Sequence, residues 1–253
     1  MSRELTAPSE RMTAAAQLAA AVVFEEEKIG KLKAIDVGCD HAKLSIYLVQ
    51  SGICSDVLAC DVNDGPVLKA KHNLSVRKFR KEPLEKYITV IKNDGLQGLD
   101  YFCPNRIFIL GMGGELIADI LEKSGFVKNT SLKTAFVVQA MTSEDLLRKY
   151  LYENGFQILR EKLVKDKGRI YSIILAVYDG IPKNMSACSC ILGEKNIEDP
   201  DAELFEAYAD RKIRILNKTI AQLEKNNMPC DDKKRLAQEL EQIKLQCLNS
   251  LSK

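Results

Sequence analysis

Short apolar runs rich in valine and isoleucine alternate, in the first part of the chain, with segments whose apolar positions recur every three or four residues. Such runs are typical of buried strands, and the recurring segments are typical of amphipathic helices. The predicted strands cover residues 33–37, 57–62, 88–92, 107–110 and 135–139. The predicted helices cover residues 14–24, 44–50, 66–79, 115–123 and 144–154. Alternation of strand and helix predicts right-handed crossovers and therefore a parallel sheet.

The pattern changes where two further apolar runs, residues 156–164 and 169–177, flank the turn sequence Lys-Asp-Lys-Gly. Two runs joined by so short a turn predict an antiparallel pair. The expected fold is therefore α/β with a mixed sheet of seven strands, whereas the plain dinucleotide-binding fold would stay parallel.

The last part of the chain carries an apolar stripe with helical spacing. Its members are Phe205, Ala209, Ile213, Leu216, Ile220, Leu223, Leu236, Leu240, Ile243 and Cys247, with an interruption at residues 226–229. This stripe predicts two helices packed as an antiparallel hairpin, or short coiled coil. We expect a first domain at residues 1–182 and a helical domain at residues 183–253. The stripe alone leaves open whether the hairpin only packs on itself or grips a large substrate.

Composition narrows the function classes only slightly. A net charge of +2 does not by itself indicate a polyanionic partner, although a local basic face could still bind one. No apolar run reaches the roughly 18 residues that span a bilayer, so no membrane segment is expected. The eight cysteines are scattered without paired metal-ligand spacing, which favours reduced structural thiols in a cytoplasmic protein and no metal site.

Candidate chemistry lies where the predicted strands end, because ligands of open α/β sheets bind beyond the carboxyl ends of the strands. The first such loop carries Asp36, Gly38, Asp40 and His41. Gly38 allows a tight turn and a close approach of the backbone to a ligand. The loop lacks further phosphate-binding glycines, and its two carboxylates would repel a pyrophosphate but suit a cation. Asp40 has an alternative interpretation as a helix N-cap.

Two further loops carry acids. Asp61 follows Gly38 by 23 residues, a spacing at which a carboxylate accepts both hydroxyls of a ribose. Asp94 lies after the third strand, where it could accept a hydrogen bond from an adenine amino group. We include the neighbouring Val62 and Gly95 among the cofactor-binding residues. The ordered set of acids favours S-adenosylmethionine over a nicotinamide dinucleotide, and so a methyltransferase.

A glycine-rich segment at residues 111–114 follows the fourth predicted strand. Glycines there would leave a flat backbone wall against which a planar base could lie, with Met112 packed on the face of the base. The alternative is an ordinary glycine-rich turn from strand to helix.

With these residues in view, the chain resembles a known family. The segments IDVGCDHAKLSIYLV, CDVNDGPVLKAKHNL, NDGL, GMGGELIADIL and GRIYSIIL occur in the order found in the bacterial tRNA (adenine-22-N1)-methyltransferases, the TrmK family. The resemblance covers nearly the whole chain. It implies a class I, Rossmann-like methyltransferase fold, S-adenosylmethionine as cofactor, and tRNA held partly by the C-terminal coiled coil. It implies cofactor-pocket positions at Asp36, Gly38, Asp61, Asp94 and Gly111, and positions near the target base at Arg11, His41 and Met112.

The chain departs from the family pattern at a few positions. Lys43 and Ser45 stand where the family usually has Tyr and Pro, and Ala140 follows Gln139 where the family has Pro. An aromatic side chain that could stack on the base is therefore missing.

The expected reaction needs no obligatory general base, because N1 of neutral adenine carries an in-plane lone pair that can attack the methyl carbon. The expected task is to extrude the base and align it. His41 could contact the base or a phosphate, or simply bond to Asp40. Two basic runs, within residues 69–81 and 211–218, are candidate contacts to tRNA. We expect a monomer. The alternatives are a small-molecule methyltransferase and an inactive RNA-binding scaffold.

Overall fold

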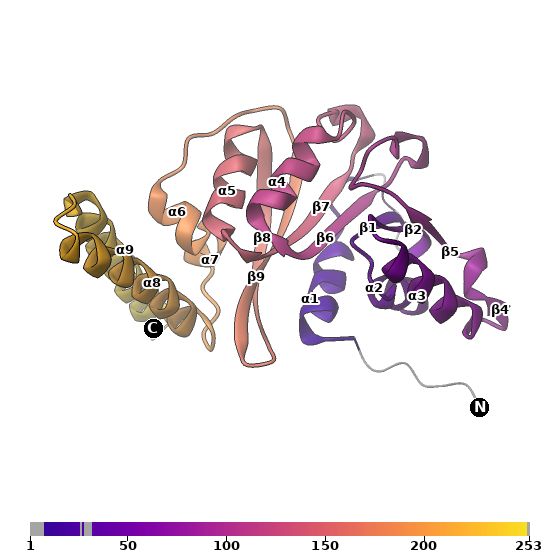
Figure 1. Cartoon of the computed structure of the whole chain (residues 1–253), viewed down its shortest axis with the longest axis horizontal. Coiled ribbons are helices and arrows are strands. Elements are labelled where there is room, and N and C mark those ends of the chain that lie inside the picture. The colour runs from indigo at the N-terminus through magenta and orange to yellow at the C-terminus, as the bar shows by residue number, and fades with distance from the viewer. Residues whose placement is uncertain (1–7, 26, 28–31, 252–253) are drawn as a thin grey trace.

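A single mixed sheet of seven strands forms the centre of the computed structural model, which describes residues 8–25, 27 and 32–251 (Figure 1). Its strands are β5 (Ile88–Lys92), β2 (Cys54–Asp61), β1 (Leu32–Val37), β6 (Arg106–Gly113), β7 (Ala135–Thr142), β9 (Arg169–Tyr178) and β8 (Phe156–Asp166), in that spatial order. The first five run parallel, and β9 is antiparallel to both of its neighbours. The predicted mixed sheet is confirmed.

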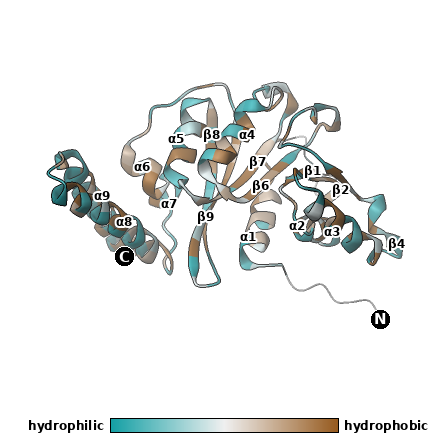
Figure 2. Cartoon of the chain, in the orientation of Figure 1, coloured by the Kyte–Doolittle hydropathy of each residue, from teal (hydrophilic) through white to brown (hydrophobic). Residues whose placement is uncertain are grey.

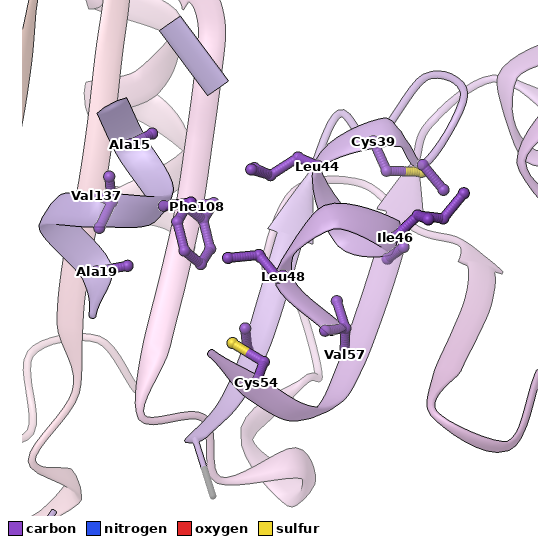
Figure 3. Packing of buried hydrophobic residues seen from close by; sticks show 14 of the residues in the cluster. Ala15, Ala19, Cys39, Leu44, Ile46, Leu48, Cys54, Val57, Phe108 and Val137 are labelled. Carbon is purple, nitrogen blue, oxygen red and sulfur yellow. The ribbon is translucent and has the colours of Figure 1, made fainter. Parts of the chain in front are cut away.

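Helices cover both faces of this sheet. One face carries α1 (Glu10–Ala19), α2 (Lys43–Gln50) and α3 (Asp64–Ser75), and the other carries α4 (Gly114–Lys123) and α5 (Glu144–Glu153). Neighbouring strand residues point to opposite faces, so Ala34 packs in the first cluster and Ile35 in the second. In Figure 3, Phe108 fills the space between Ala19 of α1 and Leu48 of α2.

Two predicted helices have different bounds in the structure. The opening helix begins and ends earlier than residues 14–24, and α3 ends at Ser75 rather than at residue 79. A small hairpin of β3 (Lys78–Phe79) and β4 (Glu82–Pro83) follows α3, with Arg80 and Lys81 at positive φ. Single-turn 3-10 helices occur at Leu84–Lys86, Asp100–Phe102 and Thr130–Leu132.

The β8–β9 hairpin is longer than the strand beside it. Ile174 pairs with Val138 of β7 and Val177 pairs with Ala135, whereas the earlier residues of β9 pair only with β8. Because β9 runs opposite to β7, those earlier residues lie toward the carboxyl end of β7, and the tip of the hairpin extends past it. The hairpin therefore projects beyond the sheet on the side where parallel strands end (Figure 1).

The C-terminal segment forms a helical layer beside α5 and β8. Short helices α6 (Ala187–Leu192) and α7 (Glu194–Glu198), which the sequence pattern did not predict, precede α8 (Phe205–Lys225) and α9 (Asp231–Leu251). The predicted helical hairpin is confirmed, and Figure 2 shows mostly hydrophilic residues along its outer surface. No helix in the described ranges is long and apolar enough to cross a membrane.

A buried polar network fastens this layer to the sheet. Arg148 of α5 donates to the Glu161 carboxylate of β8 over 2.7 Å and to the carbonyl oxygens of Cys190 and Ile191 in α6. Glu144, the first residue of α5, accepts from Tyr208 at 2.6 Å and lies 2.8 Å from Lys212, both on α8. Burial opposes the charge on Glu144, but Lys212 and Arg148 hold its pKa below its usual range.

Candidate functional site

A pocket of about 300 Å³ opens at the carboxyl ends of β1, β2, β5 and β6. Its size lies at the lower end of the range for ligand pockets. Seven residues predicted from the sequence line it together: Gly38, Asp61, Val62, Asp94, Gly95, Gly111 and Met112. The fold thus gathers side chains from positions far apart in the sequence, as the strand-end argument predicts.

Two carboxylates face this pocket from neighbouring strand ends. Asp61 ends β2, and its Oδ1 accepts a hydrogen bond of 3.0 Å from the backbone N–H of Asn63, which fixes the carboxylate at the pocket wall. Asp94 follows β5 and accepts a bond of 3.4 Å from Gln97 Nε2. Five further polar residues line the pocket and were not predicted from the sequence: Asn63, Asn93, Gln97, Asp119 and Lys123. Asn93 could have been found, because it directly precedes Asp94 at a strand end.

Gly38 lies at the wall of the pocket, where the Met112 side chain packs against it. Its φ is +72°, and a Cβ added there would lie 2.2 Å from Cε of Met112. Gly111 also has positive φ, +81°, and the Arg11 guanidinium lies 3.6 Å from the position of its missing Cβ. These two glycines let the loops after β1 and β6 approach each other and expose their backbone to a ligand.

A smaller pocket of about 60 Å³ adjoins the first and shares Gly38 and Leu110 with it. Its lining residues are Arg11, Met12, Asp36, Gly38, Cys39, Asp40, His41, Lys43, Leu44 and Leu110. Arg11 and His41, both predicted near the target base, come together here, whereas Met112 lines the larger pocket. The two pockets are therefore neighbours that share part of their wall.

Arg11 is held by side chains that are distant in sequence. Its Nη1 donates to Gln139 Oε1 over 2.9 Å, its guanidinium lies 5.3 Å from the centre of the Tyr171 ring, and its Nε lies 3.9 Å from Asp166 Oδ2. In the sequence, Gln139 is notable only because Ala140 follows it where the family has Pro. No local pattern predicts that Gln139 orients Arg11.

Asp36 lies beneath the first loop and does not line the larger pocket. It is buried, and Ser45 Oγ of α2 donates to its Oδ2 over 2.5 Å. Burial raises the pKa of Asp36 to about 6, and the negative charge of Asp61 acts in the same direction, while the bonds from Ser45 oppose the rise. Ser45, which stands where the family usually has Pro, therefore supplies a partner to a buried acid.

The turn after Gly38 explains the placement of Asp40 and His41. Asp40 and Ala42 both have positive φ, and Ala42 occupies the N-cap position of α2 without a side-chain bond. The alternative that Asp40 caps the helix is therefore wrong. Asp40 is largely exposed, lines the smaller pocket, and its Oδ2 lies 3.5 Å from His41 Nε2. The local pairing considered for His41 is thus present.

Within the described part of the chain, no three His, Cys, Asp or Glu side chains gather in a way that could hold a metal ion. All eight cysteines are unpaired, and seven of them are buried.

Known proteins with similar sequences or folds include several tRNA methyltransferases. A tRNA (adenine(22)-N(1))-methyltransferase of Bacillus subtilis is 34% identical over 153 residues, which are 58% of this chain and 61% of that protein. A structure from Streptococcus agalactiae, described as a protein in the NADB-Rossmann superfamily, matches with a TM-score of 0.74 and 25% identity, over 98% of this chain and all of that one. M. capricolum TrmK, solved with S-adenosyl-homocysteine, matches with a TM-score of 0.70 and 21% identity, over 95% and 97% of the two chains.

These matches confirm the resemblance read from the motifs and the class I methyltransferase fold. The family model described as a methyltransferase domain matches residues 20–174, which is more than half of the chain. The sheet order, the strand-end acids and the glycine-lined pocket described above all lie within or beside that region. The protein therefore belongs to the methyltransferase domain family.

Proposed function

We propose that the protein transfers the methyl group of S-adenosylmethionine to N1 of adenine 22 in tRNA. The observation that carries this proposal is the pair of adjoining pockets, one with two strand-end carboxylates and the other with Arg11 and His41, which share Gly38 and Leu110. The Bacillus relative carries the same activity in its name, and the chain spans about three fifths of the length of that relative.

The larger pocket suits the proposed cofactor in size and in donor and acceptor types. Asp61 would accept the ribose hydroxyls, and Asp94 would accept the adenine amino group. Gly38 and Gly111 carry no side chain, so Met112 and Arg11 pack closely over them at the edge of the site. When bound, the cofactor supplies an electrophilic methyl carbon on a cationic sulfur.

The remaining task of the protein is to align N1 of the adenine with the methyl carbon. N1 of adenine attacks through its own lone pair, so no residue has to remove a proton from it. Arg11 and His41 would contact the extruded base or its phosphate, and Met112, packed on Gly38, would lie beside the base and the methyl group. Gln139 keeps Arg11 oriented for this role.

We extend the proposal to the domains, the oligomeric state and the location of the protein. We propose a methyltransferase domain at residues 1–182 and a substrate-binding helical domain at residues 183–253, acting as a monomer in the cytoplasm. The chain ends of both proposed domains, residues 1–7 and 252–253, lie outside the described residues.

Incubation of the full chain with unmodified tRNA and labelled S-adenosylmethionine, followed by nucleoside analysis and position mapping, tests the proposal. Label at N1 of adenine 22 is the expected result, and label at any other atom would contradict it. Titration of the cofactor separates the alternatives. An inactive scaffold would not bind it, and a small-molecule methyltransferase would bind it without methylating tRNA.

A further inference from the structure

The tip of the β8–β9 hairpin, residues 165–169, lies on the side of the molecule where the pockets open. The register places Val138 opposite Ile174, and β7 ends only four residues later, at Thr142. The same register, continued, sets Ile170 level with Thr142, so the Asp166–Arg169 pair and the turn between them lie beyond the carboxyl end of β7. Figure 1 shows this hairpin projecting between α1 and the C-terminal helices.

Three cations stand at this tip without partners. Lys165, Lys167 and Arg169 are exposed, and in the described structure their side chains make no hydrogen bond or ion pair. The acid among them, Asp166, does not neutralise them directly, because its side chain is only 11% exposed and lies 3.9 Å from Arg11. Binding an anion here would break no existing ion pair.

The tip is joined to the smaller pocket through Arg11. This side chain contacts Asp166 of the tip and also lies over Gly111 in the wall of the site. Helix α1, which carries Arg11, is held to β8 again by a bond of 3.0 Å from Lys162 to Gln17. The position of the cations relative to the pocket is therefore fixed by packing.

The two faces of the β8–β9 hairpin pack against different parts of the molecule, one toward α1 and the other toward the helical layer. Val164 packs with α1, whereas Leu163 and Ile170 pack in the cluster of α6, α8 and α9. Lys165, which pairs with Ile170, projects on the second face, and Arg169 pairs with Asp166 on the first. The tip thus presents positive charge on both sides.

The basic run predicted on α8 is less available. Arg211 and Lys212 lie 3.5 Å and 2.8 Å from the Glu144 carboxylate, so they hold the helical layer in place. Arg214 and Lys218 remain exposed without a side-chain partner in the described structure. Lys43 lines the smaller pocket and is also exposed, and the hairpin tip adds three unpaired cations that are connected to this pocket through Arg11.

We infer that the tip of the β8–β9 hairpin binds the phosphate backbone of the RNA strand whose base enters the Arg11–His41 pocket. The inference rests on the proposed function and adds to it a surface that positions the substrate. Unpaired lysine and arginine side chains beside a base pocket are suited to phosphates, since phosphate contacts fix register while the pocket selects the base. The contact orients the strand and takes no part in the chemical step.

A triple variant with Lys165→Gln, Lys167→Gln and Arg169→Gln tests this surface in the full chain. A matched control removes three positive charges near α5, through Lys128→Gln, Lys149→Gln and Lys183→Gln. The dissociation constant for unmodified tRNA is measured between about 50 and 200 mM salt, together with that for S-adenosylmethionine. The tip variant is expected to bind tRNA about tenfold more weakly, and the slope of log affinity against log salt is expected to be shallower by about 2 to 3.

Cofactor affinity should match the wild type in both triple variants, and the melting temperature should match it in the tip variant, whose three cations are unpaired, whereas the control lysines are ion-paired. A charge-conserving variant, Lys165→Arg with Lys167→Arg and Arg169→Lys, should restore the salt slope. If the tip variant keeps the wild-type slope and affinity while the wild type methylates tRNA, the inference is overturned and the proposed function stands. If the wild type binds cofactor but methylates no tRNA, both are overturned. Tip-dependent binding to anionic lipid vesicles with unchanged tRNA binding would also overturn the inference.

Discussion

Replacement of Asp36 by Asn tests whether the first loop is built around a buried, ionised carboxylate. Burial raises the pKa of Asp36 from its ordinary value of 3.8 to about 6. Between these two values the folded protein holds a proton that the unfolded chain has lost. The wild-type free energy of unfolding therefore falls as the pH rises through this window, and it stays at the lower level above it.

The size of the effect follows from the two pKa values. At about 1.4 kcal/mol for each pH unit between them, the buried carboxylate destabilises the fold by about 3 kcal/mol above pH 6. Asn has nearly the same shape and cannot ionise, and its amide oxygen can still accept the hydrogen bond from Ser45. The free energy of unfolding of Asp36→Asn, relative to that of the wild type, should therefore rise by about 3 kcal/mol from acidic to alkaline pH.

Urea unfolding of the cofactor-free protein near pH 4 and near pH 8 measures this gain. Asp56→Asn is the control, because Asp56 lies on the neighbouring strand and its side chain makes no hydrogen bond or ion pair in the described structure. A difference between Asp36→Asn and wild type that is equal at both pH values would refute the reasoning. The variant should also bind the cationic cofactor more weakly, since it lacks a negative charge beneath the site.

Other substitutions separate the parts of the site. Asp61→Ala should lose cofactor affinity, whereas His41→Ala should lower turnover with near-wild-type cofactor affinity, and calorimetric titration showing the opposite pattern would exchange their roles. Gly38→Ala should destabilise the fold by about 1–2 kcal/mol through positive φ alone; because the new methyl also meets Met112, adding Met112→Ala should recover part of the loss in thermal unfolding. Ser45→Ala should cost about 1–3 kcal/mol at pH 8 and less near pH 4, where the acid beneath it is neutral, and an equal cost at both values would contradict its assigned partner.

Most structural features that depend on short stretches of sequence could be predicted from the sequence. The alternation of strands and helices, the mixed sheet of seven strands, and the acids at strand ends follow from local patterns and from the rule that ligands bind at carboxyl ends. Asp61 directly follows an apolar run and Asp94 lies two residues after a predicted strand, so both could be selected as strand-end acids.

What the sequence did not predict depends on contacts between distant positions. Arg11 and Gln139 are 128 residues apart, and nothing in either local segment indicates that they meet. Asp36 looked exposed to a ligand because it precedes a loop, but Ser45 on the inner face of α2 covers it. The basic run on α8 looked like a surface for RNA, although Lys212 lies against a buried acid that only the tertiary fold brings there.

The network around Glu144 limits how the two long helices can be exchanged in evolution or in engineering. A chimaera that receives the helical hairpin of another protein would lose Tyr208 and Lys212, and the buried Glu144 carboxylate would lose its hydrogen-bond donor and its nearest cation, keeping only Arg148 of its own helix nearby. Breaking such a pair by removing one partner costs about 3–5 kcal/mol, a large part of the stability of an ordinary domain. The helices should therefore be inherited together with α5, so that recombination succeeds when its crossover point lies before residue 143 rather than in the linker after residue 182.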